Sequence, residues 1–154
     1  ISLTFADNQA RFDLGSVQFV TKLVEGQFPD YNRVIPRNYG THITLGRAPL
    51  LASLQRTAIL SNEKFRGVLL HFAAGALRIA ANNAEQEEAV DELEIAYDGE
   101  AMEMGFNVTY LIDVLANVNT EEMVTLALQD AASSMLVTIP DDDGFRYVVM
   151  PMRL

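Results

Sequence analysis

The segment Met102-Glu-Met-Gly-Phe-Asn-Val-Thr-Tyr-Leu-Ile-Asp-Val-Leu-Ala-Asn-Val118 changes its hydrophobic period at Asn107. Before this residue, Met102–Phe106 has the length and composition of a short strand. After it, apolar residues recur at the spacing of one helical face, and they are Val108, Leu111, Ile112 and Leu115. Asn107 is a favourable N-cap residue. The segment therefore predicts a strand that leads directly into a helix over residues 107–118.

The same order occurs about 60 residues earlier in the chain. His42–Leu45 leads into a second predicted helix, Arg47–Leu60, in which Pro49 lies in the first turn, where its missing N–H is harmless. One face of this helix carries Leu50, Leu51, Leu54 and Ala58. Hairpin turns separate three strands after each helix, predicted at Gly67–Phe72, Ala76–Ala81, Ala89–Tyr97, Val124–Leu128, Ser134–Ile139 and Phe145–Met150. Residues 41–154 therefore contain one β-α-β-β-β unit twice.

This duplication predicts an α+β fold with two helices on one face and antiparallel sheets on the other. Each strand alternates, so that Leu93, Ile95 and Tyr97 share one face. Glu92, Glu94 and Ala96 lie on the opposite face. Each helix has one apolar stripe, which it buries against a sheet.

Residues 1–40 predict a different piece of structure. Ser2–Phe5, Arg11–Leu14 and Val17–Leu23 have strand patterns, and the proline-containing passage Phe28–Pro36 follows them. Because isolated strands have unpaired edges, we expect this piece to be poorly ordered or paired with another chain. The chain starts at Ile1 in the middle of a strand pattern, so we expect it to be part of a longer protein.

The composition excludes several functional classes. The chain has 154 residues, 49% of them hydrophobic, with a net charge of −10 and no cysteine. These values favour a folded domain without disulfides or thiolate zinc sites, and they are compatible with the cytoplasm. No apolar run is long enough for a membrane span. The acidic balance argues against a broad basic face that grips the phosphate backbone of DNA.

Catalytic and metal-binding motifs are weak in this sequence. His42 and His71 lie far apart on strand patterns, which favours structural or surface roles over general base catalysis. Asp141–Asp143 precedes Gly144 but lacks the spacing of an EF-hand, so it reads as a hairpin turn. No phosphate-binding loop or nucleophile elbow is present. We therefore expect no catalytic residue, no metal and no cofactor, although an acidic hydrolase that uses Asp113 and Glu63 stays open as an alternative.

Five separated motifs resemble, in the same order, the bacterial DNA polymerase III β subunit family, the replicative sliding clamps. The resemblance covers the whole chain and is carried by Phe28-Pro-Asp-Tyr31 with Arg33-Val-Ile-Pro36, Ile59–Gly67, Asn82–Glu88, Gly105–Tyr110 and Met150-Pro-Met-Arg-Leu154. It implies that residues 1–40 end the middle clamp domain and that residues 41–154 form the third domain. A stand-alone peptide-binding module without DNA is the alternative.

The resemblance also implies how such a protein works. Clamps of this family are head-to-tail homodimeric rings that encircle duplex DNA, with helices on the inner surface and sheets outside. They are non-catalytic processivity factors, found with the bacterial nucleoid in the cytoplasm. Their partners are the replicative polymerase α subunit, the clamp loader δ subunit and other proteins with a clamp-binding motif. A closed ring stays on DNA without strong contacts to the phosphates. The net negative charge of this chain is therefore compatible with such a function.

An apolar peptide groove of the family lies against the C-terminal tail. Methionine side chains adapt to different apolar partners, which suits such a groove. The residues that match it here are Pro29, Arg33, Val34, Tyr110, Ala132, Ser134, Val148, Val149, Met150, Pro151, Met152, Arg153 and Leu154. Because part of the groove comes from the rest of the middle domain, we expect this chain to bind partner peptides more weakly than an intact clamp.

Two further surfaces are implied by the resemblance. A dimer interface would combine apolar residues at the end of the first helix with an acidic cluster that faces basic residues of the other protomer. Its expected residues are Ile59, Leu60, Phe65, Glu85, Glu87, Glu88 and Asp91. The expected DNA-facing residues are Arg56, Lys64 and Arg66, on or near the same helix.

Overall fold

The duplicated order predicted from the sequence is present in the computed structural model, which describes residues 1–27, 30–35, 38–118 and 120–154. The first copy consists of β4 (Thr41–Gly46), α2 (Arg47–Ala58), β5 (Gly67–Ala73), β6 (Ala76–Asn82) and β7 (Glu88–Glu94). The second copy consists of β8 (Met102–Asn107), α3 (Val108–Asn117), β9 (Met123–Leu128), β10 (Met135–Ile139) and β11 (Asp142–Val149). The helix and strand limits differ from the expected ones by a few residues.

The first strand of each copy belongs to the sheet of the other copy. The two four-stranded sheets have the orders β11-β10-β9-β4 and β7-β6-β5-β8. Antiparallel pairing places Ile43 of β4 opposite Leu126 of β9, and Leu70 of β5 opposite Met104 of β8. Neither sheet is therefore complete without a strand from the other half of the sequence.

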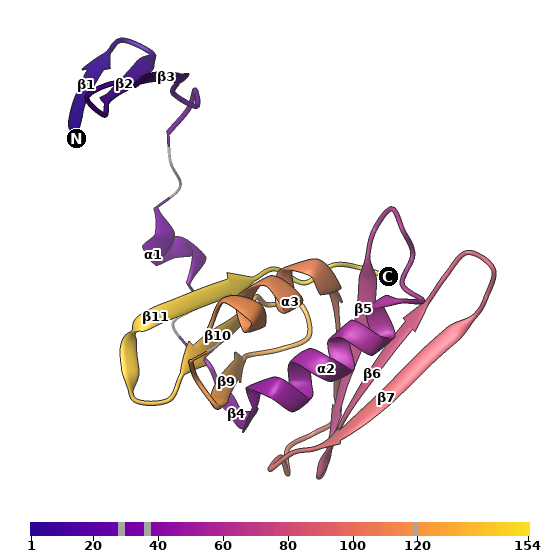
Figure 1. Cartoon of the computed structure of the whole chain (residues 1–154). Helices are drawn as coiled ribbons and strands as arrows, with labels where there is room; N and C mark the ends of the chain where they lie inside the picture. The colour runs from indigo at the N-terminus through magenta and orange to yellow at the C-terminus, as the bar shows by residue number, and fades with distance from the viewer. Residues whose placement is uncertain (28–29, 36–37, 119) are drawn as a thin grey trace. The chain divides into compact units, whose positions relative to one another are not determined.

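A shared core lies under both helices. α2 and α3 pack against one another, and α2 also contacts β6 and β7. Figure 1 shows α3 (orange) and α2 (magenta) side by side between the two sheets. One cluster of buried residues includes Leu54 of α2, Leu115 of α3, Phe72 of β5 and Val137 of β10. The helices and sheets of the two copies therefore share one hydrophobic core.

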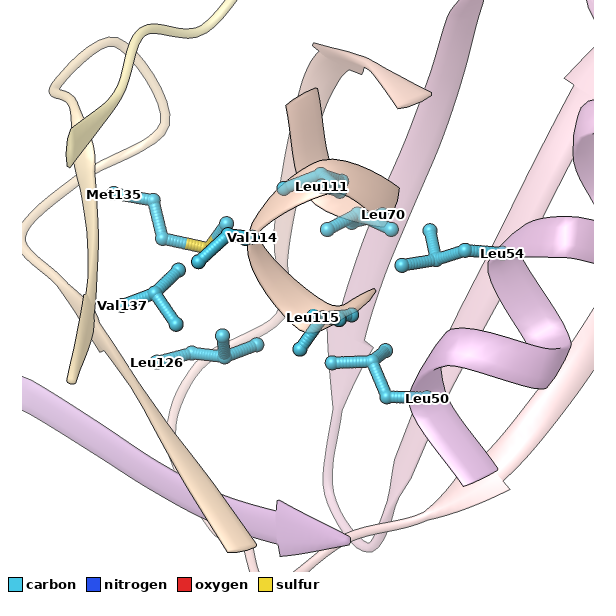
Figure 2. Close-up of a pocket in the computed structure, with 9 residues that line it drawn as sticks. All are labelled: Leu50, Leu54, Leu70, Leu111, Val114, Leu115, Leu126, Met135 and Val137. Carbon is cyan, nitrogen blue, oxygen red and sulfur yellow. The ribbon is translucent and has the colours of Figure 1, made fainter. Parts of the chain in front are cut away.

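A small cavity at the centre of this core is not a ligand site. Figure 2 shows that its walls are apolar side chains from both helices and both sheets: Leu50, Leu54, Leu70, Leu111, Val114, Leu115, Leu126, Met135 and Val137. Its volume is about 10 Å³, which barely holds one water molecule. No polar group lines it, so it is a packing defect.

The two helices start in different ways. The Asn107 side chain caps α3 by accepting a hydrogen bond of 2.9 Å from the Thr109 amide, as the sequence predicts. α2 starts after Gly46, which has no side chain to act as a cap. A side-chain cap is therefore present at the start of α3 and absent at the start of α2.

Arg47 connects the start of α2 to the end of α3. Its Nη1 donates to the Leu115 carbonyl at 2.9 Å, and its Nε donates to the Glu121 carbonyl at 2.8 Å. Its backbone amide donates to the Glu122 carbonyl at 2.8 Å. Carbonyls in the last turn of a helix lack intrahelical partners, so the guanidinium satisfies the Leu115 carbonyl of α3 as well as the Glu121 carbonyl in the segment before β9.

The first 31 residues form a separate compact unit, and residues 32–154 form the other. The first unit is the antiparallel sheet β1-β2-β3, made of Ser2–Ala6, Gln9–Asp13 and Gln18–Lys22. Its strands pair with one another, but Leu3, Phe5 and Phe19 stay exposed. A short helix, α1 (Tyr31–Val34), follows, which the sequence pattern did not predict. No helix in the described part of the chain is long and apolar enough to cross a membrane.

Substitution of Arg47 tests the connection between the copies. We expect Arg47→Ala to lower the free energy of unfolding by about 1–3 kcal/mol, because hydrogen bonds from a charged donor are lost and part-buried carbonyls are left open. Arg146→Ala removes the same charge from an exposed position of β11 and should change stability by less than about 0.5 kcal/mol. Equal values from urea unfolding of the two variants would contradict a connecting role for Arg47.

Candidate functional site

The C-terminal segment leaves the first sheet and reaches the second. Val149 ends β11, where it lies opposite Met135 of β10. Three residues later, the Met152 amide donates a hydrogen bond of 2.8 Å to the Gly105 carbonyl on β8. Figure 1 shows this segment (yellow) running from β11 to the upper end of β5. The predicted groove residues from Val148 to Leu154 therefore cross the molecule from one sheet to the other.

Tyr110 projects from the first turn of α3 beside β11. α3 contacts β11, and Tyr110 is exposed. Burial raises the pKa of Tyr147 on β11, and the nearby Asp113 and Tyr110 raise it further. The contacts between α3, which carries Tyr110 and Asp113, and β11, which carries Tyr147, agree with this influence. The structure thus brings Tyr110, predicted from the sequence, next to the strand that leads into the tail.

Ala132 and Ser134 lie in a turn before β10, although the sequence predicted a strand that started at Ser134. The turn is organised by Asp130, whose carboxylate accepts hydrogen bonds from the Ala132 and Ser133 amides at 2.9 and 2.8 Å. These bonds hold the pKa of Asp130 below its ordinary value. β10 therefore begins at Met135, one residue later than predicted, after a turn in which the Asp130 side chain binds the backbone amides of Ala132 and Ser133.

The remaining groove predictions lie on the connector. Arg33 and Val34 belong to α1, where Arg33 is exposed and Val34 is half-buried. Pro29 lies outside the described residues. Tyr147 was not among the predicted residues, although its position on the half-buried face of β11 could have suggested it.

The chain is similar to known proteins over its whole length. The family model for the DNA polymerase III beta subunit, C-terminal domain, matches residues 32–153. The beta sliding clamps of Pseudomonas putida and Escherichia coli K12 are 48% and 45% identical to this chain over all 154 residues.

The chain belongs to the bacterial β sliding clamp family.

Solved clamp structures show the same fold. The DNA polymerase III subunit beta of Pseudomonas aeruginosa is 47% identical, with a TM-score of 0.86 over 99% of this chain and 42% of that one. The Caulobacter crescentus pol III beta is 38% identical, with a TM-score of 0.86 over 99% of this chain and 41% of that one. A Pseudomonas aeruginosa clamp bound to griselimycin is 47% identical, with a TM-score of 0.83 over 99% of this chain and 41% of that one. The chain spans less than half the length of the clamps that it matches.

The predicted dimer residues of the clamp domain gather around α2 and β7. Ile59 and Phe65 are 78% and 53% exposed, while Leu60 is half-buried. Lys64 lies over the Phe65 ring, with 5.1 Å from Nζ to the ring centroid. The outer edge of β7 has no partner strand among the described residues. This corner of the domain therefore combines exposed apolar side chains with an open strand edge.

The acidic residues of this corner have defined partners. Asn83 organises the loop before β7, since its amide nitrogen donates to Glu87 at 2.7 Å and its oxygen accepts from the Glu85 and Glu87 amides. Glu88 approaches Arg78 to 3.7 Å, a loose exposed pair. The acidic loop is thus held in one conformation by its own hydrogen bonds.

Two of the three predicted DNA-facing residues are engaged within the domain. Arg56 forms a salt bridge with Asp91 of β7, and its Nε donates to that carboxylate at 2.9 Å. Arg66 approaches the Ala58 carbonyl at the end of α2, at 3.5 Å. Arg56 and Asp91, assigned to different surfaces from the sequence, therefore form one contact.

The contact with Arg56 predicts a lowered pKa for Asp91. The hydrogen bond from Arg56 is the main cause that holds the pKa of Asp91 below its ordinary value. A carboxylate with a lowered pKa stabilises the fold above the pKa of the unfolded chain, and this contribution is lost as the pH falls through the folded pKa. Because the Arg56 side chain is 60% exposed, solvent screening limits the contribution to less than about 1 kcal/mol.

We expect Arg56→Gln to raise the pKa of Asp91, followed by NMR titration of its side-chain carboxyl carbon. Arg78→Gln is the matched control, because Arg78 pairs loosely with Glu88 and should leave the pKa of Asp91 unchanged. If the pKa of Asp91 is the same in the unchanged chain, in Arg56→Gln and in Arg78→Gln, the contact between Arg56 and Asp91 is absent in solution.

Proposed function

We propose that this chain is the C-terminal part of a DNA polymerase processivity factor that encircles duplex DNA as a homodimeric ring. In this proposal residues 1–40 end the middle domain, and residues 41–154 form the third domain. The subunit is non-catalytic, and its chemistry belongs to the polymerase that it tethers. Membership of the clamp family and the placement of both helices side by side support the proposal.

The charge distribution on the helices is the observation that carries it. The chain has 21 acidic residues, and only Asp113 lies on α2 or α3. The carboxylates lie instead on the strands and loops, so the helix pair presents a nearly neutral wall on a protein of net charge −10. DNA could pass close to such a wall without strong repulsion.

The same wall offers no tight grip on phosphates. Arg56 is neutralised by Asp91, while Lys64 and Arg66 follow α2 at its end. Few phosphate contacts give weak, sequence-independent binding with a shallow salt dependence. This suits a protein that stays on DNA through ring closure and slides along it.

Partner proteins would bind at the tail. Tyr110, Val148 and the segment Met150–Leu154 offer aromatic, β-branched and methionine side chains, which adapt to apolar peptides. The related clamp bound to griselimycin supports a ligand site in this family. We assign this groove to the replicative polymerase α subunit, the clamp loader δ subunit and other clamp-binding proteins. Because the chain spans less than half of a clamp, it should bind them more weakly than the whole protein.

The second protomer would bind at the corner of α2 and β7. Ile59, Leu60 and Phe65 supply apolar contact, and Glu85, Glu87 and Glu88 supply negative charge for a basic partner surface. The exposed apolar residues of β1-β2-β3 fit a sheet that continues into the rest of a middle domain. Such a protein would act in the bacterial cytoplasm, at the nucleoid.

The tail groove alone also fits a peptide-binding module without DNA. The dependence on DNA topology separates the two functions. We expect the full-length protein that contains this chain, after loading by its clamp loader, to stay on nicked circular DNA during gel filtration. It should leave the same DNA within minutes of linearisation, because a ring slides off a free end.

Loss from circular and linear DNA at equal rates would contradict encirclement and favour the peptide-binding module. Linear DNA with both ends blocked by bound protein is the control, and it should retain the clamp.

A further inference from the structure

Two glycines on neighbouring strands lie under the end of the chain. Gly67 starts β5, and Gly105 lies on β8. In the antiparallel register Gly67 pairs with Asn107 and Leu69 pairs with Gly105, so the two glycines are diagonal neighbours on one face. This is the face turned away from the core, since Val68 and Phe106 on the same strands are buried in it.

The backbone itself does not require glycine at either position. The described glycines with positive φ are Gly15, Gly26 and Gly75, so Gly67 and Gly105 adopt conformations open to any residue. Glycine in the interior of a strand otherwise weakens it and commonly marks the close approach of another group. The cause therefore lies in what covers the two glycines.

The C-terminal segment occupies the space that two side chains would fill. A Cβ atom at Gly105 would lie 2.5 Å from the Met152 carbonyl oxygen and 3.1 Å from Leu154 Cγ. A Cβ atom at Gly67 would overlap Leu154 Cδ2, and the three heavy atoms nearest to it all belong to the Leu154 side chain. Gly105 also accepts the hydrogen bond from the Met152 amide.

We propose that Gly67 and Gly105 form a seat that positions the C-terminal segment for partner binding. This inference rests on the proposed groove and adds its positioning residues, neither of which is among the predicted site residues. The seat fixes the tail at Met152 and Leu154, while β11 fixes it at Val149. The residues between these points, Met150 and Pro151, are thereby held across the gap between the two sheets.

The physical gain is pre-organisation. A free tail would lose conformational entropy when a partner binds, because each residue that becomes ordered loses backbone freedom. A tail that is fixed on the two glycines has already lost this entropy during folding, so the partner binds to a surface that is already formed. Removal of the seat should therefore weaken partner binding without any change in the residues that touch the partner.

Gly105→Ala and Gly67→Ala separate the two halves of the seat. Gly105→Ala presses on the tail backbone, so we expect fast hydrogen exchange at the Met152 amide and about tenfold weaker ligand binding. Gly67→Ala displaces the flexible Leu154 side chain and not the tail backbone at Met152, so the Met152 amide should stay protected and binding should weaken by about threefold or less. Gly40→Ala is the matched control, because a Cβ there meets no atom within 4 Å.

The ligand in this test is griselimycin, followed by NMR titration of the 154-residue chain, which detects even millimolar affinity. If the Met152 amide of Gly105→Ala exchanges fast but the affinity for griselimycin is unchanged, the proposed role of the seat is wrong, while the proposed groove is not affected. A Met152 amide that exchanges freely in the unchanged chain would also overturn it. Because this chain lacks part of the groove, the same variants are also titrated in the full-length protein that contains it. Absence of griselimycin binding there would overturn the proposed groove, and the seat's role in partner binding with it.

Discussion

The pairing of β4 with β9 and of β8 with β5 is the constraint on which the rest of residues 41–154 depends. Each of these pairs joins one copy of the repeat to the other. Because the leading strand of each copy runs into its helix without a loop, the exchange also fixes where α2 and α3 start. The two helices then meet over one core, and Arg47 ties the start of one to the end of the other.

This arrangement separates the two proposed surfaces. The helix pair forms a face nearly free of carboxylates, while the outer strands and loops carry most of the negative charge. The end of the chain bridges the two sheets through the hydrogen bond from Met152 to Gly105, so its position depends on the same exchanged strand, β8. The surfaces that we propose for DNA and for partner peptides are therefore supported by one core, and no residue is assigned to both.

Much of the fold could be predicted from the sequence, because hydrophobic periods report which face of an element is buried. The two helices, the Asn107 cap and the strands of each copy follow from such local patterns. The strand exchange could not be predicted, since a pattern shows that a strand is buried without naming its neighbour. For the same reason Arg56 and Asp91 were assigned to two surfaces, although the fold joins them. The tail residues followed from the resemblance, but the two glycines beneath them needed coordinates.

Native-state hydrogen exchange in low concentrations of urea tests the central claim, that neither copy of the repeat is stable without the other. The account predicts that the core amides of β4, α2, β8 and α3 exchange only by one common unfolding event, with the same free energy and the same dependence on urea. Opening of residues 41–97 while residues 102–149 stay protected, or the reverse, would contradict it.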